Sequence, residues 1–166
     1  FWCLDSIARR LRGVTHVRSV YTGGSAQTAN YYAVCSGATD HAEAVEITFD
    51  PEQLPVSVLY EVFFSTHDPT SLNRQGHDVG PQYRSAIFYA DERQREQAQA
   101  FIDELEQQGA FDAPIVTKLE PLAEYYDAEA YHHDYFRNNP DQAYCAVVIA
   151  PKVAKLRRTY SERLQR

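Results

Sequence analysis

The chain has 166 residues, 44% of them hydrophobic and 23% charged, with 12 Tyr and 8 Phe. This length and composition are typical of a globular domain with enough chain for a sizeable core. The net charge of −7 argues against nucleic acid as the main partner, and no stretch approaches the roughly 20 apolar residues that span a bilayer.

Apolar residues recur at helical spacing in the first segment, and Gly13 follows them as a helix-ending residue. A run rich in β-branched residues and a later alternating run each predict a strand, the second ended by Pro51. In chain order we expect a helix over 1–12, a strand over 14–21, a turn over 22–25, a loop over 26–30, a strand over 41–50 and a helix over 54–66.

The second half contains a polar loop followed by alternating strand and helix patterns. Asp91 is a favourable N-cap for the clearest helical pattern, which Gly109 ends. In chain order we expect a loop over 70–82, a strand over 83–89, a helix over 91–108, a short strand over 115–119, a helical segment over 124–136, a turn over 138–141 and a helix over 151–166.

These elements predict an α+β fold. If a strand precedes Phe1, their order is β-α-β-β-α-β followed by a helix-strand-helix extension, which is the pattern of a ferredoxin-like two-layer sandwich with a C-terminal extension. No internal repeat, low-complexity tract or linker is visible. We therefore expect one catalytic domain over 1–166, with an N-terminal strand upstream of residue 1.

Glu43 is the most informative residue by pattern alone. It lies on the same face of its predicted strand as Val45, Ile47 and Phe49. A carboxylate on a buried face must be hydrogen-bonded, paired or neutral, and desolvation raises a carboxyl pKa, which keeps an acid protonated near neutral pH. The alternative is a strand-end Glu that reaches solvent.

The loop over 67–84 is long and polar, and such loops are often functional. It contains two His-Asp pairs, His67-Asp68 and His77-Asp78. Their spacing matches no closed zinc pattern and the loop lacks Cys, so we expect no metal. The pair His132-His133 is interpreted in the same way, as surface or hydrogen-bonding residues.

Three cysteines, Cys3, Cys35 and Cys145, do not form the dense disulfide framework of a small secreted domain. Cys145 follows the turn at 138–141, so it is either a buried inert thiol or a thiol that can move, as a resolving cysteine must. Because the number of cysteines is odd and the chain does not begin with Met, the sequence raises the question of a fourth cysteine upstream. The compartment stays open without the true N-terminus, and the expected location is cytoplasmic.

Together these motifs resemble the A-type peptide-methionine sulfoxide reductases, which reduce the S epimer of methionine sulfoxide. Phe1-Trp2-Cys3 is similar to the end of a Gly-Cys-Phe-Trp-Cys motif whose Gly-Cys is absent. The other matching segments cover nearly the whole chain: Tyr21-Thr22-Gly23-Gly24, Tyr31 to Gly37, His41 to Val45, His67 to Thr70, Arg74-Gln75-Gly76, Asp78-Val79-Gly80, Gln82 to Ser85, His132 with Tyr135, Asn139-Pro140 and Tyr144-Cys145.

The resemblance implies roles for five residues around the sulfoxide. Phe1 and Trp2 hold its methyl group. Glu43 protonates its oxygen, to which Tyr31 and Tyr83 hydrogen-bond.

The resemblance also implies a thiol cycle. The nucleophilic Cys is expected immediately before Phe1, with Asp78 hydrogen-bonded around it, while His132 and Tyr135 complete the substrate site. After the sulfoxide is reduced, Cys145 acts as the resolving cysteine, and thioredoxin is the expected reductant. No metal or organic cofactor is implied, and we expect a monomer.

Some positions depart from the family pattern. Val20 replaces Gly, His77 replaces Asn and Pro81 replaces Thr, and none of these removes an assigned group. Tyr32 beside Tyr31 makes the choice of phenol ambiguous. Cys3 stands where Gly is frequent, which makes it a possible extra redox thiol.

Two other functions stay open from the sequence. An inferred Cys-Phe-Trp-Cys motif suggests a general thiol-disulfide oxidoreductase, although this explains neither an inward Glu43 nor the long loop. If the residue before Phe1 is neither Cys nor selenocysteine, the chain is a binding module for methionine sulfoxide without a nucleophile.

Overall fold

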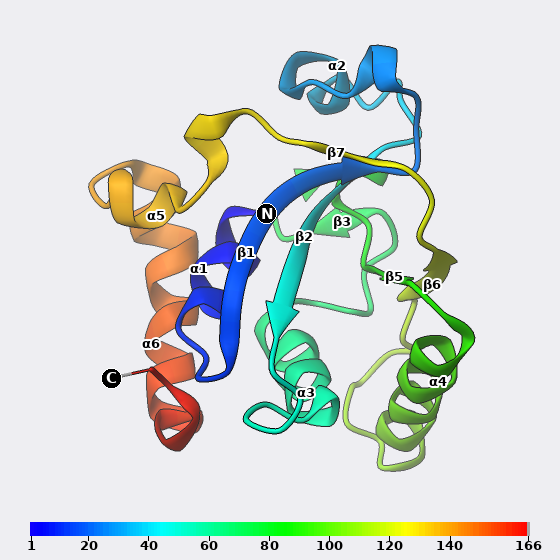
Figure 1. Cartoon of the computed structure of the whole chain (residues 1–166), viewed down its shortest axis with the longest axis vertical. Coiled ribbons are helices and arrows are strands. Elements are labelled where there is room, and N and C mark those ends of the chain that lie inside the picture. The colour runs from blue at the N-terminus through cyan, green and yellow to red at the C-terminus, as the bar shows by residue number, and fades with distance from the viewer. Residues whose placement is uncertain (166) are drawn as a thin grey trace. The chain divides into compact units, whose positions relative to one another are not determined.

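Figure 1 shows the computed structural model of the chain, which describes residues 1–165 and mixes helices with strands along its length. The residues form two compact units. The first unit comprises residues 1–20, 43–66 and 127–165, and the second comprises residues 21–42 and 67–126. The expected α+β class is confirmed.

The first unit contains a three-stranded sheet, in which β1 lies between β2 and β7. Its elements are α1 (Trp2–Arg9), β1 (Val14–Thr22), β2 (Ala42–Phe49), α3 (Val56–Thr66), β7 (Tyr125–Asp127), the 3-10 turn η3 (Ala130–His132), α5 (Tyr135–Asn138), the π-helical turn η4 (Cys145–Ile149), α6 (Ala150–Thr159) and the 3-10 turn η5 (Ser161–Arg163). Strands β1, β2 and β7 begin or end a few residues inside the second unit.

The core of the first unit lies where α1 packs. Ile7 and Leu11, four residues apart, face the same side of α1 and its continuation, and Leu11 is fully buried. Leu156 of α6 packs in the same cluster, and Figure 1 shows α6 running alongside α1. Gly13 follows at φ 98°, and a Cβ there would lie 2.9 Å from the Cβ of Leu54, so this tight turn requires glycine.

The second unit contains a parallel pair of strands, β5 with β6, in which Ile87 is opposite Leu119. Helix α4 begins where the Asp91 side chain accepts a hydrogen bond from the backbone nitrogen of Gln94 at 2.8 Å. The elements of this unit are η1 (Ala26–Thr28), α2 (Tyr31–Cys35), β3 (Arg74–Gln75), β4 (Asp78–Val79), η2 (Pro81–Tyr83), β5 (Ala86–Tyr89), α4 (Glu92–Gln107) and β6 (Lys118–Pro121).

Three expectations for the elements are wrong. The segment 124–136 is not one helical segment, because Tyr125–Asp127 forms β7 and only short helical turns follow. Tyr favours strands, and the backbone nitrogen of Ala128 donates to the carbonyl of Ser19 in β1 at 2.9 Å. The expected loop over 70–82 is not all loop, because the short strands β3 and β4 pair within it. The last helix begins earlier than residue 151, with the π-helical turn at Cys145.

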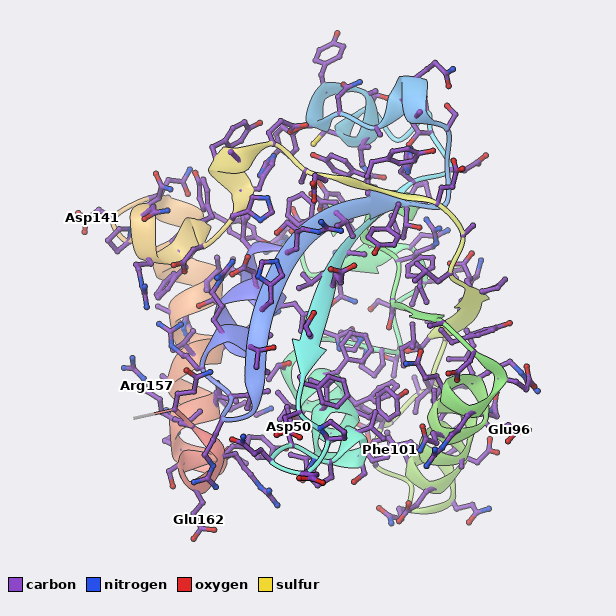
Figure 2. The ribbon with its side chains drawn as sticks, viewed as in Figure 1. Asp50, Glu96, Phe101, Asp141, Arg157 and Glu162 are labelled. Atoms are coloured by element: carbon purple, nitrogen blue, oxygen red, sulfur yellow. The ribbon has the colours of Figure 1, made fainter. Side chains whose placement is uncertain are left out.

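Charged side chains point outward at and near the C-terminal helix. Arg157 extends outward from α6, and Asp141 extends outward from the turn that precedes Cys145 (Figure 2). Within residues 1–165, no helix combines the length and the apolar character needed to cross a membrane.

Candidate active site

The predicted site residues are divided between the two units. Those in the first unit are Phe1, Trp2, Glu43, His132, Tyr135 and Cys145, with Cys3 as the possible extra thiol. Those in the second unit are Tyr31, Asp78 and Tyr83.

Trp2, the first residue of α1, lies among aromatic rings that come from far along the chain. Its ring stacks on that of Tyr135, with centroids 3.8 Å apart and planes 6° from parallel. The ring of Tyr144 meets it edge-on at 5.6 Å, and the ring of His132 lies 5.8 Å away. We call Trp2, His132, Tyr135 and Tyr144 the Trp2 cluster. It joins the two predicted substrate residues Trp2 and Tyr135 in direct contact.

His132 fixes the orientation of Trp2 and is completely buried. The indole Nε1–H of Trp2 donates to Nδ1 of His132 at 3.0 Å. Because Nδ1 accepts, the proton of the neutral ring lies on Nε2, which donates to Oε2 of Glu129 at 3.1 Å. His132 thus has a hydrogen-bonding role, although not on the surface. Phe1 also packs on His132, with ring centroids 4.9 Å apart.

Glu129 is a site residue that the sequence analysis missed. It precedes the 3-10 turn η3, which places its carboxylate against the ring three residues later. The spacing alone is a weak signal, because any exposed Glu at that distance from a His would match it. Burial lowers the pKa of His132, and the Glu129 carboxylate only partly opposes this effect.

Acidification is expected to weaken the fold through His132. The unfolded imidazole protonates near its ordinary pKa of 6.5, whereas the lowered pKa of the folded state keeps the ring neutral. The contribution to the free energy of unfolding is therefore fully present above pH 6.5 and is lost as the pH falls towards the folded pKa. Urea unfolding at several pH values between 7.5 and about 5, followed by the fluorescence of Trp2, measures this loss.

The control for this experiment is His132→Gln, which cannot gain the proton. Its stability should fall less on acidification than that of the unmodified protein. An identical pH dependence in the two proteins would contradict the assignment of the effect to His132, because the other five histidines (6 − 1 = 5) are common to both.

Glu43 points inward from β2. Only 9% of its side-chain surface is exposed, and its Oε2 lies 4.0 Å from the backbone nitrogen of Phe1. The structure therefore agrees with the inward alternative rather than with a side chain that reaches solvent. The carboxyl group of Glu43 therefore lies near the N-terminal end of α1.

Cys145 is fully buried in the π-helical turn η4, and Ile149 and Val153 pack with it. Trp2 and Cys3 pack against the same group. Burial raises the pKa of the Cys145 thiol, and the neighbouring Cys3 raises it further. Cys3 is partly exposed and Cys35 is exposed, and all three cysteines are free. The turn at 138–141 is followed by the π-helical turn η4 that holds Cys145. Such turns are frequent at functional sites.

In the second unit, Gln82 links the segments that carry the two predicted phenols. It is buried between Pro81 and Tyr83, and its Nε2 donates to the carbonyl oxygen of Cys35 at the end of α2, which begins at Tyr31. Gly80 has φ 143°, and a Cβ there would lie 2.2 Å from Oε1 of Gln82. Glycine is therefore required where the chain turns towards Tyr83.

The long loop holds its own polar groups together. Asp78 lies in β4 opposite Gln75 of β3. Asp68 accepts hydrogen bonds from the hydroxyls of Ser71 and Thr70, which lower its pKa. No group of three or more His, Cys, Asp or Glu with the arrangement of a metal site occurs among residues 1–165.

Comparison with known proteins gives one consistent family. The family model described as "Peptide methionine sulfoxide reductase" matches residues 1–164. The proteins called "Peptide methionine sulfoxide reductase MsrA" from Deinococcus radiodurans and Chromobacterium violaceum are each 51% identical to this chain over 165 residues. These alignments cover 99% of the chain, and 80% and 94% of the two relatives.

Solved structures agree with these matches. Mxr1 from Saccharomyces cerevisiae in its reduced form has a TM-score of 0.79 at 30% identity, covering 87% of this chain and 83% of that one. Methionine sulfoxide reductase A of Corynebacterium diphtheriae has a TM-score of 0.64 at 36% identity, covering 77% and 65%. Mxr1 in complex with Trx2 has a TM-score of 0.54 at 21% identity, covering 81% and 77%.

Proposed function

Because the chain belongs to the peptide methionine sulfoxide reductase family, we propose that it reduces the S epimer of methionine sulfoxide, free or within proteins, to methionine. Such an enzyme repairs oxidative damage to proteins. One observation supports this most directly: the carboxyl group of Glu43, which is 9% exposed, lies 4.0 Å from the backbone nitrogen of Phe1, the residue before Trp2. An acid and the aromatic Trp2 cluster thus lie at the N-terminal end of α1.

The Trp2 cluster receives the methyl group of the sulfoxide. Trp2 is held by Tyr135 on one ring face and by its hydrogen bond to His132, so its position does not depend on the substrate. A preformed apolar surface binds a small methyl group without the cost of ordering side chains. Phe1 completes this surface.

The expected nucleophile is a cysteine immediately before Phe1. At the start of α1, the exposed N–H groups and the helix dipole lower a thiol pKa, which favours the thiolate. The thiolate attacks the sulfoxide sulfur, and Glu43 in its protonated form gives its proton to the oxygen. Tyr31 and Tyr83 donate hydrogen bonds to that oxygen, and Asp78 hydrogen-bonds around the nucleophile.

This mechanism requires both units to form a single catalytic domain. One observation favours it: the family model matches residues 1–164, which include both units. We propose a ferredoxin-like two-layer sandwich with a C-terminal extension, completed by a strand upstream of residue 1. The proposed protein is a cytoplasmic monomer that needs no metal or organic cofactor.

The nucleophile is restored through a disulfide. The protonated oxygen passes to the cysteine sulfur as the bond between the two sulfurs breaks, which releases methionine and leaves a sulfenic acid. The Cys145 thiol then attacks the sulfenic sulfur, forming the disulfide and releasing water. Thioredoxin then reduces this disulfide by exchange, which is consistent with the complex of the yeast relative with Trx2. Cys3 packs in the cluster of Cys145, so it is the alternative resolving thiol.

The proposal is tested with the two separated epimers of methionine sulfoxide and full-length protein, with thioredoxin, thioredoxin reductase and NADPH. We expect NADPH oxidation with the S epimer and none with the R epimer. Insulin reduction without sulfoxide reduction would instead indicate a general thiol-disulfide oxidoreductase. Binding of the S epimer without turnover would indicate a module that lacks the nucleophile.

A further inference from the structure

Asp5 is a buried acid that the mechanism above does not use. It lies in α1 and is 1% exposed. Its Oδ1 accepts from Nε of Arg9 at 2.5 Å, and its Oδ2 accepts from Nη2 of Arg9 at 3.3 Å. A buried carboxylate is tolerated only when its oxygens are paired in this way. Arg9 alone would neutralise the negative charge of Asp5, so the remaining hydrogen bonds of Asp5 have another role.

Those other contacts lead to two distant segments. Oδ2 of Asp5 accepts a hydrogen bond from the backbone nitrogen of Asp134 at 3.2 Å. It also receives the Ser19 hydroxyl of β1, at 3.5 Å. Asp5 therefore joins α1 both to the central strand of the sheet and to the segment after β7. The second of these connections spans 129 residues.

The connection at Asp134 is made where the chain bends sharply. Asp134 has φ 54°, a left-handed conformation that is uncommon for residues other than glycine. It lies between His132, which accepts the indole hydrogen bond of Trp2, and Tyr135, which stacks on Trp2. The backbone group that Asp5 holds is thus situated between the two residues that contact Trp2 from this segment.

We propose that Asp5 is a positioning residue for the Trp2 cluster. It anchors the bend at Asp134 to the same helix that carries Trp2, and so sets how His132 and Tyr135 meet the indole. The consequence for catalysis rests on the proposed function, in which this cluster binds the substrate methyl group. The geometric role is independent of that function.

The test variant is Asp5→Asn in the full-length protein. Asn has the same shape but no charge, and one of its two terminal atoms is an NH2 group that cannot accept. It therefore loses either the hydrogen bond from Nε of Arg9 at the Oδ1 position or the hydrogen bonds from Arg9 and Asp134 at the Oδ2 position. We expect the emission spectrum of Trp2, the one tryptophan of the chain, to shift. The KM for methionine sulfoxide should rise about tenfold, which corresponds to ~1.4 kcal/mol, with a smaller change in kcat, because binding to the pocket is lost in the ground state and the transition state alike.

Asp134→Gly is the matched control. It removes the side chain that lies 3.8 Å from Nε of Arg9, but it retains the backbone N–H and suits a positive φ. Its Trp2 spectrum and KM should be those of the unmodified protein. If Asp5→Asn does not fold, Asp5→Glu retains the charge while displacing the carboxylate, and the same spectral shift is expected from it.

The outcomes separate the two proposals. An unchanged spectrum and an unchanged KM in a folded Asp5 variant would overturn the positioning role, as would equal effects in Asp134→Gly. A spectral shift confined to the Asp5 variant supports it, even if the unmodified protein reduces no sulfoxide. That last result would refute the proposed function alone.

Discussion

Replacing Glu43 with Gln is expected to slow the reduction of methionine sulfoxide by about 10²–10⁴-fold, the usual contribution of acid catalysis. The sulfoxide oxygen is a poor leaving group until it is protonated. Gln fills the same space beside the backbone nitrogen of Phe1 but has no acidic proton to give. The fold should survive, since the substitution removes a mostly buried ionisable group without leaving a cavity.

The rate is measured in a single turnover, as methionine formed per protein, so that recycling does not contribute. Glu46→Gln is the matched control, because Glu46 lies on the other face of β2, where it pairs with Arg18 at 3.5 Å. It should react at nearly the unmodified rate. A comparable rate in Glu43→Gln would rule out Glu43 as the acid.

Replacing Cys145 with Ser is expected to stop the reaction after one methionine per protein. The first reduction uses the nucleophile alone, so the initial burst remains. The sulfenic acid then has no resolving thiol to attack it, and thioredoxin has no disulfide to reduce. Quenched samples should show one equivalent of methionine and no further NADPH oxidation.

Two other cysteine variants make this result specific. Cys35→Ser changes an exposed thiol of α2 in the second unit and should leave recycling intact. Cys3→Ser changes the thiol that packs in the cluster of Cys145. If recycling continues in Cys145→Ser and stops in Cys3→Ser, then Cys3 is the resolving cysteine.

The sequence predicted best the elements whose signals are local. Helix α4 was expected over 91–108 and spans Glu92–Gln107, because its cap, its apolar spacing and its terminal glycine all lie within the segment itself. The segment 124–136 was predicted wrongly because its strand, β7, depends on pairing with β1 about a hundred residues earlier. Pairing between segments that are so far apart in the chain produces no periodic pattern in the sequence of either segment.

The same difference between local and distant signals applies to the residues of the candidate site. Motifs identified Trp2, His132 and Tyr135 as residue types with chemical roles, but their contacts could not be derived from spacing. The hydrogen bond from Trp2 to His132 joins positions 130 residues apart. Glu129 and Asp5 were missed for this reason, since each acts on a partner that only the folded chain brings near.

The π-helical turn at Cys145 has a consequence for how this segment tolerates changes in length. A turn of this kind is equivalent to one residue inserted into an α-helix. The wide turn absorbs that residue, so the residues on its two sides keep nearly the relative orientation that a regular α-helix would give them. Deleting one residue within the turn would therefore give a regular helix while leaving Cys145 and Val153 on the same side, the one that packs with Trp2. Inserting one residue between the turn and Val153 would instead rotate the thiol by about 100° relative to Val153. The place at which a residue is added or removed, more than its hydrophobicity, therefore determines where the thiol lies.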